Sequence, residues 1–213
     1  EPSREESPLR PSNPYSVSKA GADMMAQAYH RTYGLETVVV RLCNNYGPRQ
    51  FPEKLVPLMV RCMLSGERLP VYGNGLQRRD WLYVDDGARA LLAGLEKGID
   101  GQIYNVAAHQ ERTNLEVVET LCRMVGEQGG LSTESLWASI EYVADRPGHD
   151  LRYAIDDHAF RETTGWSPEV GFDHGIEKTV AWYLKNHQRL VNRDIPDYRR
   201  DYEFIQDRLR RRV

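Results

Sequence analysis

The chain has 213 residues, of which 40% are hydrophobic and 28% charged, a composition typical of a globular protein with one or two domains. Its 28 basic and 31 acidic residues give a net charge of -3, which argues against a nucleic acid or a membrane surface as partner. No apolar run approaches the roughly 20 residues that cross a bilayer, and residues 1–6 lack the apolar segment of a secretory signal. We therefore expect a cytoplasmic protein.

The first third of the chain predicts a helix, a buried strand and a second helix. Asn13 as N-cap and Pro14 in the first turn begin a helix that runs to Tyr33, and Gly34 ends it. The β-branched run 37–42 is typical of a buried parallel strand. Residues 44–52 are predicted as a polar loop, and 54–65 as a helix. A helix followed by a buried strand is the order found in doubly wound α/β sheets.

The remaining chain predicts short strands that alternate with helices. The predicted strands are residues 69–73, 79–84, 103–106 and 140–143, and a glycine turn separates the first two. The predicted helices are residues 87–97, capped by Asp85 or Asp86, 114–128, capped by Asn114, and 156–164 and 173–187. Residues 188–213 form a charged C-terminal tail.

A glycine-rich phosphate turn is missing from this pattern. A dinucleotide-binding domain needs GxGxxG or GxxGxxG between its first strand and helix, whereas the turn Gly73–Gly75 is short and leads into a strand. We therefore expect these residues to lack the first half of such a domain. The predicted fold class is α/β: the C-terminal part of a doubly wound Rossmann-type sheet, together with a smaller α/β substrate-binding domain.

The cysteines and histidines do not have the spacing of a metal site. Cys43, Cys62 and Cys122 are odd in number and far apart, and no CxxC pair occurs. The six histidines show no HExxH spacing. We expect buried, reduced thiols and no metal.

Tyr15 and Lys19 are the first candidates for chemistry. Their i, i+4 spacing places a phenol and an ammonium on one helix face. A nearby positive charge lowers the pKa of a tyrosine and lets it accept a proton from a sugar hydroxyl. The same spacing is common in solvated surface pairs, so it does not identify a site by itself.

Longer motifs around this pair carry a resemblance to a known family. Residues 13–20, followed by 41–48, resemble the extended short-chain dehydrogenase/reductase family. Residues 51–57, 79–86, 144–150 and 152–156 follow in order and look like the branch of nucleotide-sugar 4,6-dehydratases that act on dTDP-glucose. The resemblance covers about residues 7–186.

The resemblance implies a fold division and a reaction. Residues 1–48 would be the remaining part of an NAD-binding Rossmann domain, and 49–187 mainly a nucleotide-sugar-binding domain with segments returning to the Rossmann sheet. Tyr15 would remove the C4 hydroxyl proton as the C4 hydride passes to NAD; water would leave across C5–C6 and the hydride would return to C6. A homodimer with a nucleotide-sugar substrate is implied, without nucleic acid or membrane.

Family roles carry over to matching positions only. Tyr15 and Lys19 correspond to catalytic residues, and Tyr15, Lys19 and Asn45 to cofactor contacts. The positions that correspond to nucleotide-sugar contacts are Asn44, Lys54, Leu55, Pro70, Tyr72, Arg79, Asn114, Arg146 and His149. The family's acid and base for water loss lie upstream of this chain, and Glu5 and Glu6 are not assigned that role.

Alternative readings remain for single residues and for the whole chain. Arg79 and Arg146 could pair with Asp80 and Asp145 at the surface, Tyr72 could be strand packing, and His149 could be an ordinary loop residue. The protein could also be a nucleotide-sugar epimerase or decarboxylase of the same family, or a noncatalytic half that needs a complementing chain. A nucleic-acid role for the terminal arginines 208 and 210–212 is a distant third possibility.

Overall fold

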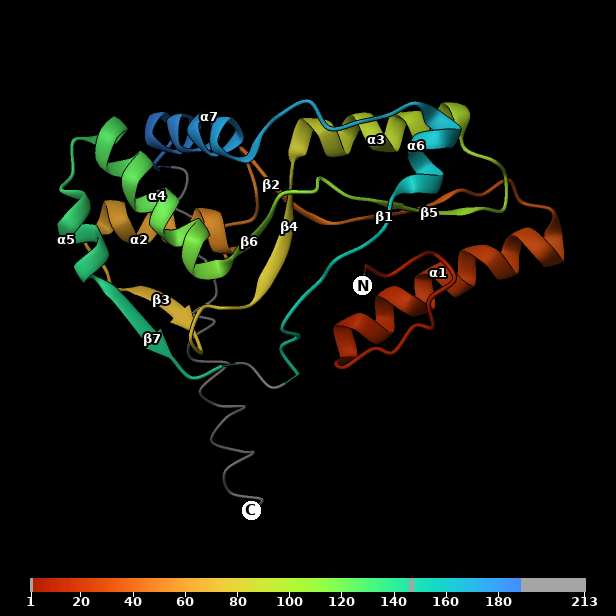
Figure 1. Cartoon of the computed structure of the whole chain (residues 1–213), viewed down its shortest axis with the longest axis horizontal. Helices are drawn as coiled ribbons and strands as arrows, with labels where there is room; N and C mark the ends of the chain where they lie inside the picture. Colours follow the sequence, from red (N-terminus) through yellow and green to blue (C-terminus); the bar gives the residue numbers. More distant parts are fainter. Residues whose placement is uncertain (1, 146–147, 189–213) are drawn as a thin grey trace, which may run out of the picture.

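The computed structural model describes residues 2–145 and 148–188, and shows an α/β protein (Figure 1). Its helices are α1 (Pro14–Tyr33), α2 (Leu55–Ser65), α3 (Val84–Lys97), α4 (Asn114–Gly129), α5 (Thr133–Ala138), α6 (His158–Thr164) and α7 (Phe172–Lys185). Its strands are β1 (Val39–Leu42), β2 (Asn44–Tyr46), β3 (Leu69–Tyr72), β4 (Arg78–Tyr83), β5 (Ile103–Val106), β6 (Glu111–Thr113) and β7 (Ile140–Val143). Arg146 and the tail from residue 189 lie outside the described residues.

The strands form short sheets that are mostly parallel. β1 pairs with β5, β2 with β4, and β3 with β7, all in parallel, while β4 and β6 are antiparallel. A single residue, Cys43, separates β1 from β2, so one extended segment has β5 as neighbour in its first half and β4 in its second. Parallel pairing confirms the strand predicted for this segment. The predicted burial is wrong, because residues 37–42 are all partly exposed.

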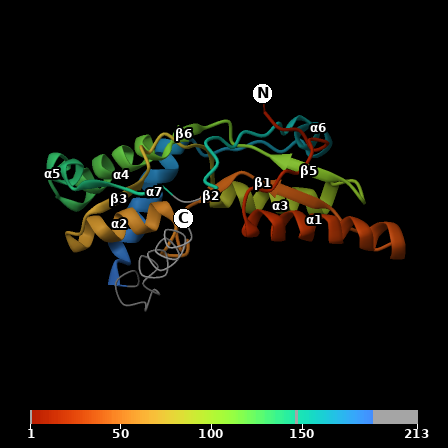
Figure 2. The same cartoon turned by 90° about the horizontal axis from the view of Figure 1, so that it is seen from below.

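Helix α1 lies along one edge of the molecule, as both ribbon views show (Figures 1 and 2). The Asn13 side chain caps it by accepting a hydrogen bond from the Ser16 amide, and Gly34 ends it with a φ of 66°. None of its residues is buried. An ion pair of 2.7 Å between Arg41 on β1 and Asp23 ties the helix to the sheet.

The hydrophobic core is divided into two clusters. The larger gathers α2, α4, α7, β3 and β4, and includes Met59, Leu121 and Ile176. The smaller joins β4, α3, β5 and α6 through Leu82, Tyr104, Val106, Phe160 and Trp166, with partly buried side chains of residues 38–43 packed against it. Trp81 belongs to the larger cluster, and Trp182 packs against it. The boundary near residue 48 stays a prediction.

Two predicted helix caps are wrong. α3 begins at Val84 with Tyr83 as N-cap, so Asp85 and Asp86 lie inside its first turn instead of capping a helix from residue 87. The buried Asp86 carboxylate accepts the amides of Glu169 and Val170.

The second wrong cap is Asn114, which is the first residue of α4 and not its cap. Thr113 caps this helix through a capping box, because its hydroxyl accepts the Glu116 amide while the Glu116 carboxylate accepts the Thr113 amide.

The polar segment 44–52 is not entirely a loop. Its first residues form β2, whose register aligns Asn44 with Trp81 and Asn45 with Leu82. The short elements α5 and β6 were also not expected. Pairing with β4 explains two of these differences, since both β2 and β6 are strands only because β4 lies between them.

None of the three cysteines forms a disulfide; Cys62 and Cys122 are buried and Cys43 is partly buried. Burial raises the pKa of Cys122 to about 12, so this thiol stays protonated at neutral pH. Within residues 2–145 and 148–188, no cluster of His, Cys, Asp or Glu is arranged to hold a metal ion. No helix in the same ranges has the length and apolarity needed to cross a membrane.

Candidate functional site

Tyr15 and Lys19 lie near the start of α1, on the predicted common face. Tyr15 is 73% exposed, and Lys19 is exposed as well. Their backbone is held by the Asn13 cap, whose side chain lies 2.9 Å from the Ser16 amide. The helix therefore presents a phenol and an ammonium outward, in positions where a ligand can reach both.

Asn44 and Asn45 lie on β2, at the end of the segment that begins with β1. Asn44 is exposed, whereas the partly buried Asn45 donates a hydrogen bond of 3.0 Å from its side-chain amide to the Cys43 carbonyl. Its other amide atom lies close to Gly87, where a Cβ would overlap Asn45 Oδ1. Because Gly87 has no side chain, the Asn45 amide can pack directly against α3.

The loop after β2 is anchored by α7. Tyr46 donates from its hydroxyl to the Phe172 carbonyl at 3.1 Å, and Tyr183 donates to the Gly47 carbonyl at 3.2 Å. Burial raises the pKa of Tyr183 to about 12. Gly47 has a φ of 154°, and a Cβ there would overlap the Val84 side chain. These contacts fix the loop that joins the two asparagines to α2.

Lys54, Leu55 and Pro70 occupy separate places. Lys54 is the exposed N-cap residue of α2 and lies 3.1 Å from the Glu53 carboxylate. Leu55 packs against the larger core cluster, and Pro70 is buried in β3 opposite Glu141. Of these three, Lys54 alone presents a polar head to solvent.

Three of the predicted nucleotide-sugar contacts meet around one buried amide, that of Gln77. Gln77 is 3% exposed; its Nε2 donates to Asp145 Oδ2 at 2.7 Å and lies 3.5 Å from the Tyr72 carbonyl. Its Oε1 lies 3.5 Å from Asn114 Nδ2, and its carbonyl accepts the Asn114 amide at 3.0 Å. His149 Nδ1 lies 2.6 Å from the other Asp145 oxygen. We call Tyr72, Gln77, Asn114, Asp145 and His149 the Gln77 cluster.

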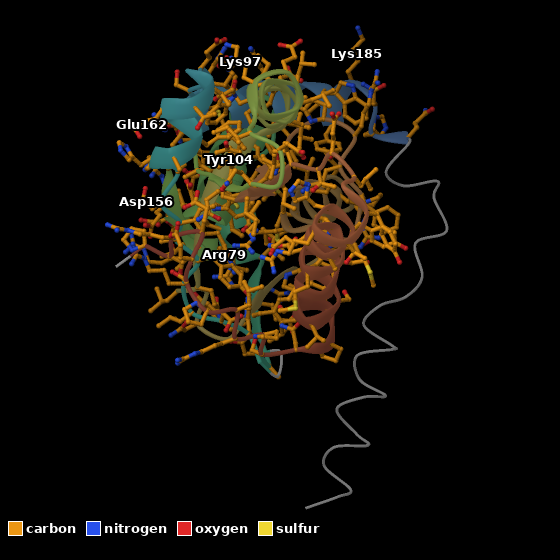
Figure 3. The ribbon with its side chains drawn as sticks, turned by 90° about the vertical axis from the view of Figure 1, so that its right-hand side faces the viewer. Arg79, Lys97, Tyr104, Asp156, Glu162 and Lys185 are labelled. Carbon is orange, nitrogen blue, oxygen red and sulfur yellow. The ribbon has the colours of Figure 1, made fainter. Side chains whose placement is uncertain are left out.

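Arg79 lies inside the protein and not at its surface. Arg79 is only 5% exposed, and Figure 3 labels it within the body of the molecule. The guanidinium donates to the carbonyls of Arg78 and Asp150, each at 2.7 Å, and to that of Leu151 at 3.4 Å. Its carbon lies 4.2 Å from the centre of the Tyr153 ring.

The alternative of a surface pair between Arg79 and Asp80 is wrong. Neighbouring residues of a strand point to opposite faces, and the Asp80 carboxylate is buried against the backbone amides of residues 108–110, at 2.7, 3.2 and 2.7 Å. Asp80 therefore fixes the turn after β5, while Arg79 fixes the segment 150–153. Arg146 lies outside the described residues, so its expected contact stays a prediction.

Sequence reasoning missed Gln77 and the role of Asp145. Both lie in or next to motifs that the sequence singled out, but a buried amide that joins two distant loops has no local signature. Glu5, which was left without a catalytic role, accepts the Asn105 amide at 2.8 Å and so ties the N-terminal segment to β5.

The comparisons with known proteins identify the family. The family model described as GDP-mannose 4,6 dehydratase matches residues 1–179. The chain belongs to this family. It is 50% identical over 189 residues to an Escherichia coli dTDP-glucose 4,6-dehydratase, covering 86% of this chain and 52% of that protein. A Neisseria gonorrhoeae dTDP-glucose 4,6-dehydratase is 50% identical over 194 residues, with 88% and 55% covered. The chain thus spans about half the length of these relatives.

Solved structures of the family agree with the fold. The dTDP-glucose 4,6-dehydratase DesIV of Streptomyces venezuelae, with NAD and TYD bound, matches with a TM-score of 0.81 and 43% identity, covering 89% of this chain and 56% of that one. The dTDP-glucose 4,6-dehydratase of Bacillus anthracis, in complex with NAD, has a TM-score of 0.79, 46% identity and coverages of 88% and 57%. The UDP-glucose 4-epimerase of Thermotoga maritima, at 30% identity, has a TM-score of 0.78 and coverages of 87% and 58%. The α/β fold therefore matches the Rossmann-type fold of this family's dehydratases and epimerases.

Proposed function

We propose that this chain is the part of an NAD-dependent dTDP-glucose 4,6-dehydratase that binds the nucleotide-sugar and carries the Tyr–Lys pair. The full reaction converts dTDP-glucose to dTDP-4-keto-6-deoxy-glucose. The observation that carries this proposal is the Gln77 cluster, which gathers Tyr72, Asn114 and His149 from three distant segments. Identity of 50% to dTDP-glucose 4,6-dehydratases supports the same conclusion.

The residues of this chain fit one part of the NAD molecule. Tyr15 and Lys19 present a hydroxyl and an ammonium at an exposed helix face, and Asn45 holds a fixed amide at the end of β2. Such donors suit a ribose and a nicotinamide amide. When bound, NAD supplies reversible hydride acceptance at the sugar's C4. The chain contains no glycine turn for the pyrophosphate.

Within the reaction, the chain's own groups bind the substrate and move one proton. Tyr15, as the phenolate that the Lys19 ammonium one turn away stabilises, accepts the C4 hydroxyl proton and becomes a neutral phenol. Tyr72 offers a flat ring beside the nucleotide's thymine base, while Asn114 offers amide donors. Arg79 and Arg146 would bind the pyrophosphate, because a guanidinium donates two parallel hydrogen bonds to carboxylates and phosphates alike. Asn44, Lys54, Leu55 and Pro70 complete the proposed pocket.

The surface of α1 supports a further part of the proposal, namely that another protein segment covers this helix in the active enzyme. The helix exposes four large apolar side chains, each between 47% and 75% exposed: Met24, Met25, Tyr29 and Tyr33. A soluble globular protein usually leaves a smaller apolar face in contact with water. We propose that the residues for water loss and the phosphate turn come from that segment. A homodimer, also proposed, is checked by sedimentation of the complete enzyme.

The proposal that another segment supplies the phosphate turn and the residues for water loss can be tested directly. The 213-residue chain, supplied with NAD and dTDP-glucose, should form no 4-keto-6-deoxy sugar, because each missing acid or base contributes about 10²–10⁴-fold. Adding the N-terminal half of the E. coli relative as a separate chain should restore product. Product at an enzymatic rate from the chain alone would contradict the division. Failure of every complementing half, despite a complex on gel filtration, would contradict the dehydratase assignment.

A second candidate reaction is nucleotide-sugar epimerisation. It is favoured by the 30% identity and TM-score of 0.78 to the Thermotoga UDP-glucose 4-epimerase. An epimerase shares the Tyr–Lys pair but returns the hydride to C4, so it loses no water. Mass spectrometry of the product from the complemented enzyme separates the two, since dehydration lowers the mass by one water and epimerisation leaves it unchanged.

A further inference from the structure

Asp150 and Ser12 form a contact between two segments that the proposed function uses separately. The Ser12 hydroxyl donates to Asp150 Oδ2 at 3.0 Å and lies 3.3 Å from the Gly148 carbonyl. Ser12 precedes Asn13, the cap of α1, and stands three positions before Tyr15. Asp150 directly follows His149 of the Gln77 cluster. The contact therefore joins the beginning of the Tyr–Lys helix to the loop that carries a proposed substrate contact.

The backbones approach closely at this point. Gly148 has a φ of 68°, and a Cβ there would lie 3.0 Å from the Ser12 carbonyl oxygen. A side chain at position 148 would therefore be strained and crowded against the start of α1. The side-chain nitrogen Nδ2 of Asn13 lies 3.4 Å from the Ser12 hydroxyl, which links the same contact to the helix cap.

Asp150 is itself held from the protein interior. Its carbonyl accepts from the buried Arg79 at 2.7 Å, and its carboxylate accepts from the Tyr153 hydroxyl at 2.5 Å. The Tyr153 ring lies against the Arg79 guanidinium. Asp150 is thus fixed to Arg79 of β4 both through its own carbonyl and through Tyr153. Because its carboxylate also contacts Ser12, a shift of the loop would move the start of the helix.

We propose that Asp150 is a positioning residue, which sets the first turn of α1, and with it Tyr15, according to the position of loop 148–153. Asp150 touches neither the reacting atoms nor the cofactor in this role; it acts through Ser12 and the Asn13 cap. The inference rests on the proposed function, because it assigns the two segments to one site. Its consequence is that occupation of the nucleotide pocket stabilises the helix turn that bears the base.

The test measures amide hydrogen exchange in the 213-residue chain, at Ser16 and Val17, whose amides bond to the Asn13 side chain and carbonyl. Asp150→Asn and Ser12→Ala should each speed exchange at these amides about three- to tenfold, the effect expected when one exposed hydrogen bond of ordinary strength is lost. Ser12→Thr keeps the hydroxyl and should restore slow exchange. Unchanged exchange in both variants would overturn the proposal.

A matched control uses a contact close by, between the N-terminal segment and the residues that follow loop 148–153. Asp156→Asn removes the exposed ion pair with Arg4, 3.6 Å long, without touching Ser12. It should leave exchange at Ser16 and Val17 unchanged. If it speeds their exchange as much as Asp150→Asn does, general loosening of the N-terminal segment explains the result, and the proposal fails.

A second arm adds dTDP as the probe. Saturating dTDP should slow exchange at Ser16 and Val17 in the wild-type chain, and have no such effect in Asp150→Asn, while the melting temperatures of the two remain similar. Slowing that is equal in both would overturn the coupling. If calorimetry detects no dTDP binding to the wild-type chain, the proposed nucleotide site is contradicted, whereas the ligand-free arm still decides the role of Asp150.

Discussion

Replacing Arg79 by alanine should destabilise the protein as well as weaken nucleotide binding. The guanidinium makes short hydrogen bonds to the carbonyls of Arg78 and Asp150, a longer one to Leu151, and packs on the Tyr153 ring. Hydrogen bonds from a charged donor contribute about 1.5–3 kcal/mol each. The Leu151 carbonyl keeps a second donor, the Arg78 amide at 2.7 Å, so we expect a net loss of about 3 kcal/mol in the free energy of unfolding.

Thermal unfolding without ligand measures this effect. For a chain of this size, 1 kcal/mol corresponds to about 2–4 °C, so the melting temperature of Arg79→Ala should fall by about 6–12 °C. Arg79→Lys retains one donor group without the fork and should lose about half as much. Calorimetry below the melting temperature should also show dTDP affinity weakened by about 1.5–3 kcal/mol, if Arg79 contacts the pyrophosphate as proposed.

The control is the neighbouring Arg78→Ala. The Arg78 side chain is 51% exposed and lies 3.6 Å from Glu111, an exposed ion pair that contributes at most about 1 kcal/mol. Its melting temperature should stay within about 4 °C of the wild type. An Arg79→Ala protein that melts at the wild-type temperature would refute the reasoning, because the buried guanidinium would then not hold segment 150–153.

Three further predictions concern single residues. Tyr15→Phe should abolish turnover of the complemented enzyme with little change in melting temperature, since the side chain is 73% exposed; retained formation of the 4-keto sugar would point to another base. Asp80→Asn should lower the free energy of unfolding in urea by about 2–3 kcal/mol, because its amide group would place a donor against backbone donors; an unchanged midpoint would contradict this. Tyr183→Phe should lower the free energy of unfolding by about 1 kcal/mol at pH 8, and the difference in stability between wild type and variant should narrow from pH 10 to 12. Burial raises the pKa of Tyr183 to about 12, so the folded wild type resists deprotonation and loses stability over that window, whereas the variant does not. A gap that widens with pH would be inconsistent with this sign.

Local sequence rules predicted the elements whose ends carry their own signals. Asn13 with Pro14, and Gly34, define α1 because capping and left-handed backbone depend on one or two residues. The same local rules gave the wrong N-cap where two suitable capping residues are neighbours in the sequence. Thr113 and Asn114 both suit an N-cap, and the structure uses Thr113 because Glu116 then lies at the position that closes the capping box.

Other features depended on partners that no local rule contains. Asn44 and Asn45 are poor strand formers, and they form β2 because β4 offers a parallel edge beside them. Gln77 was missed because its amide reaches Asp145 and Asn114, in segments far away along the chain. The alternation of a strand does suffice to separate Arg79 from Asp80, and could have excluded their pairing from the sequence.

The parallel pairing of the strands has a consequence for biosynthesis. Leu69 of β3 pairs with Ile140 of β7, and Val39 of β1 with Ile103 of β5, so each strand leaves the ribosome long before its partner. At about 5–20 residues per second, β3 stays without its neighbour for several seconds, with an apolar edge open to other chains. Non-local pairing of this kind also slows folding itself. The nascent chain therefore exposes the unpaired edge of β3 to aggregation until β7 has been synthesised.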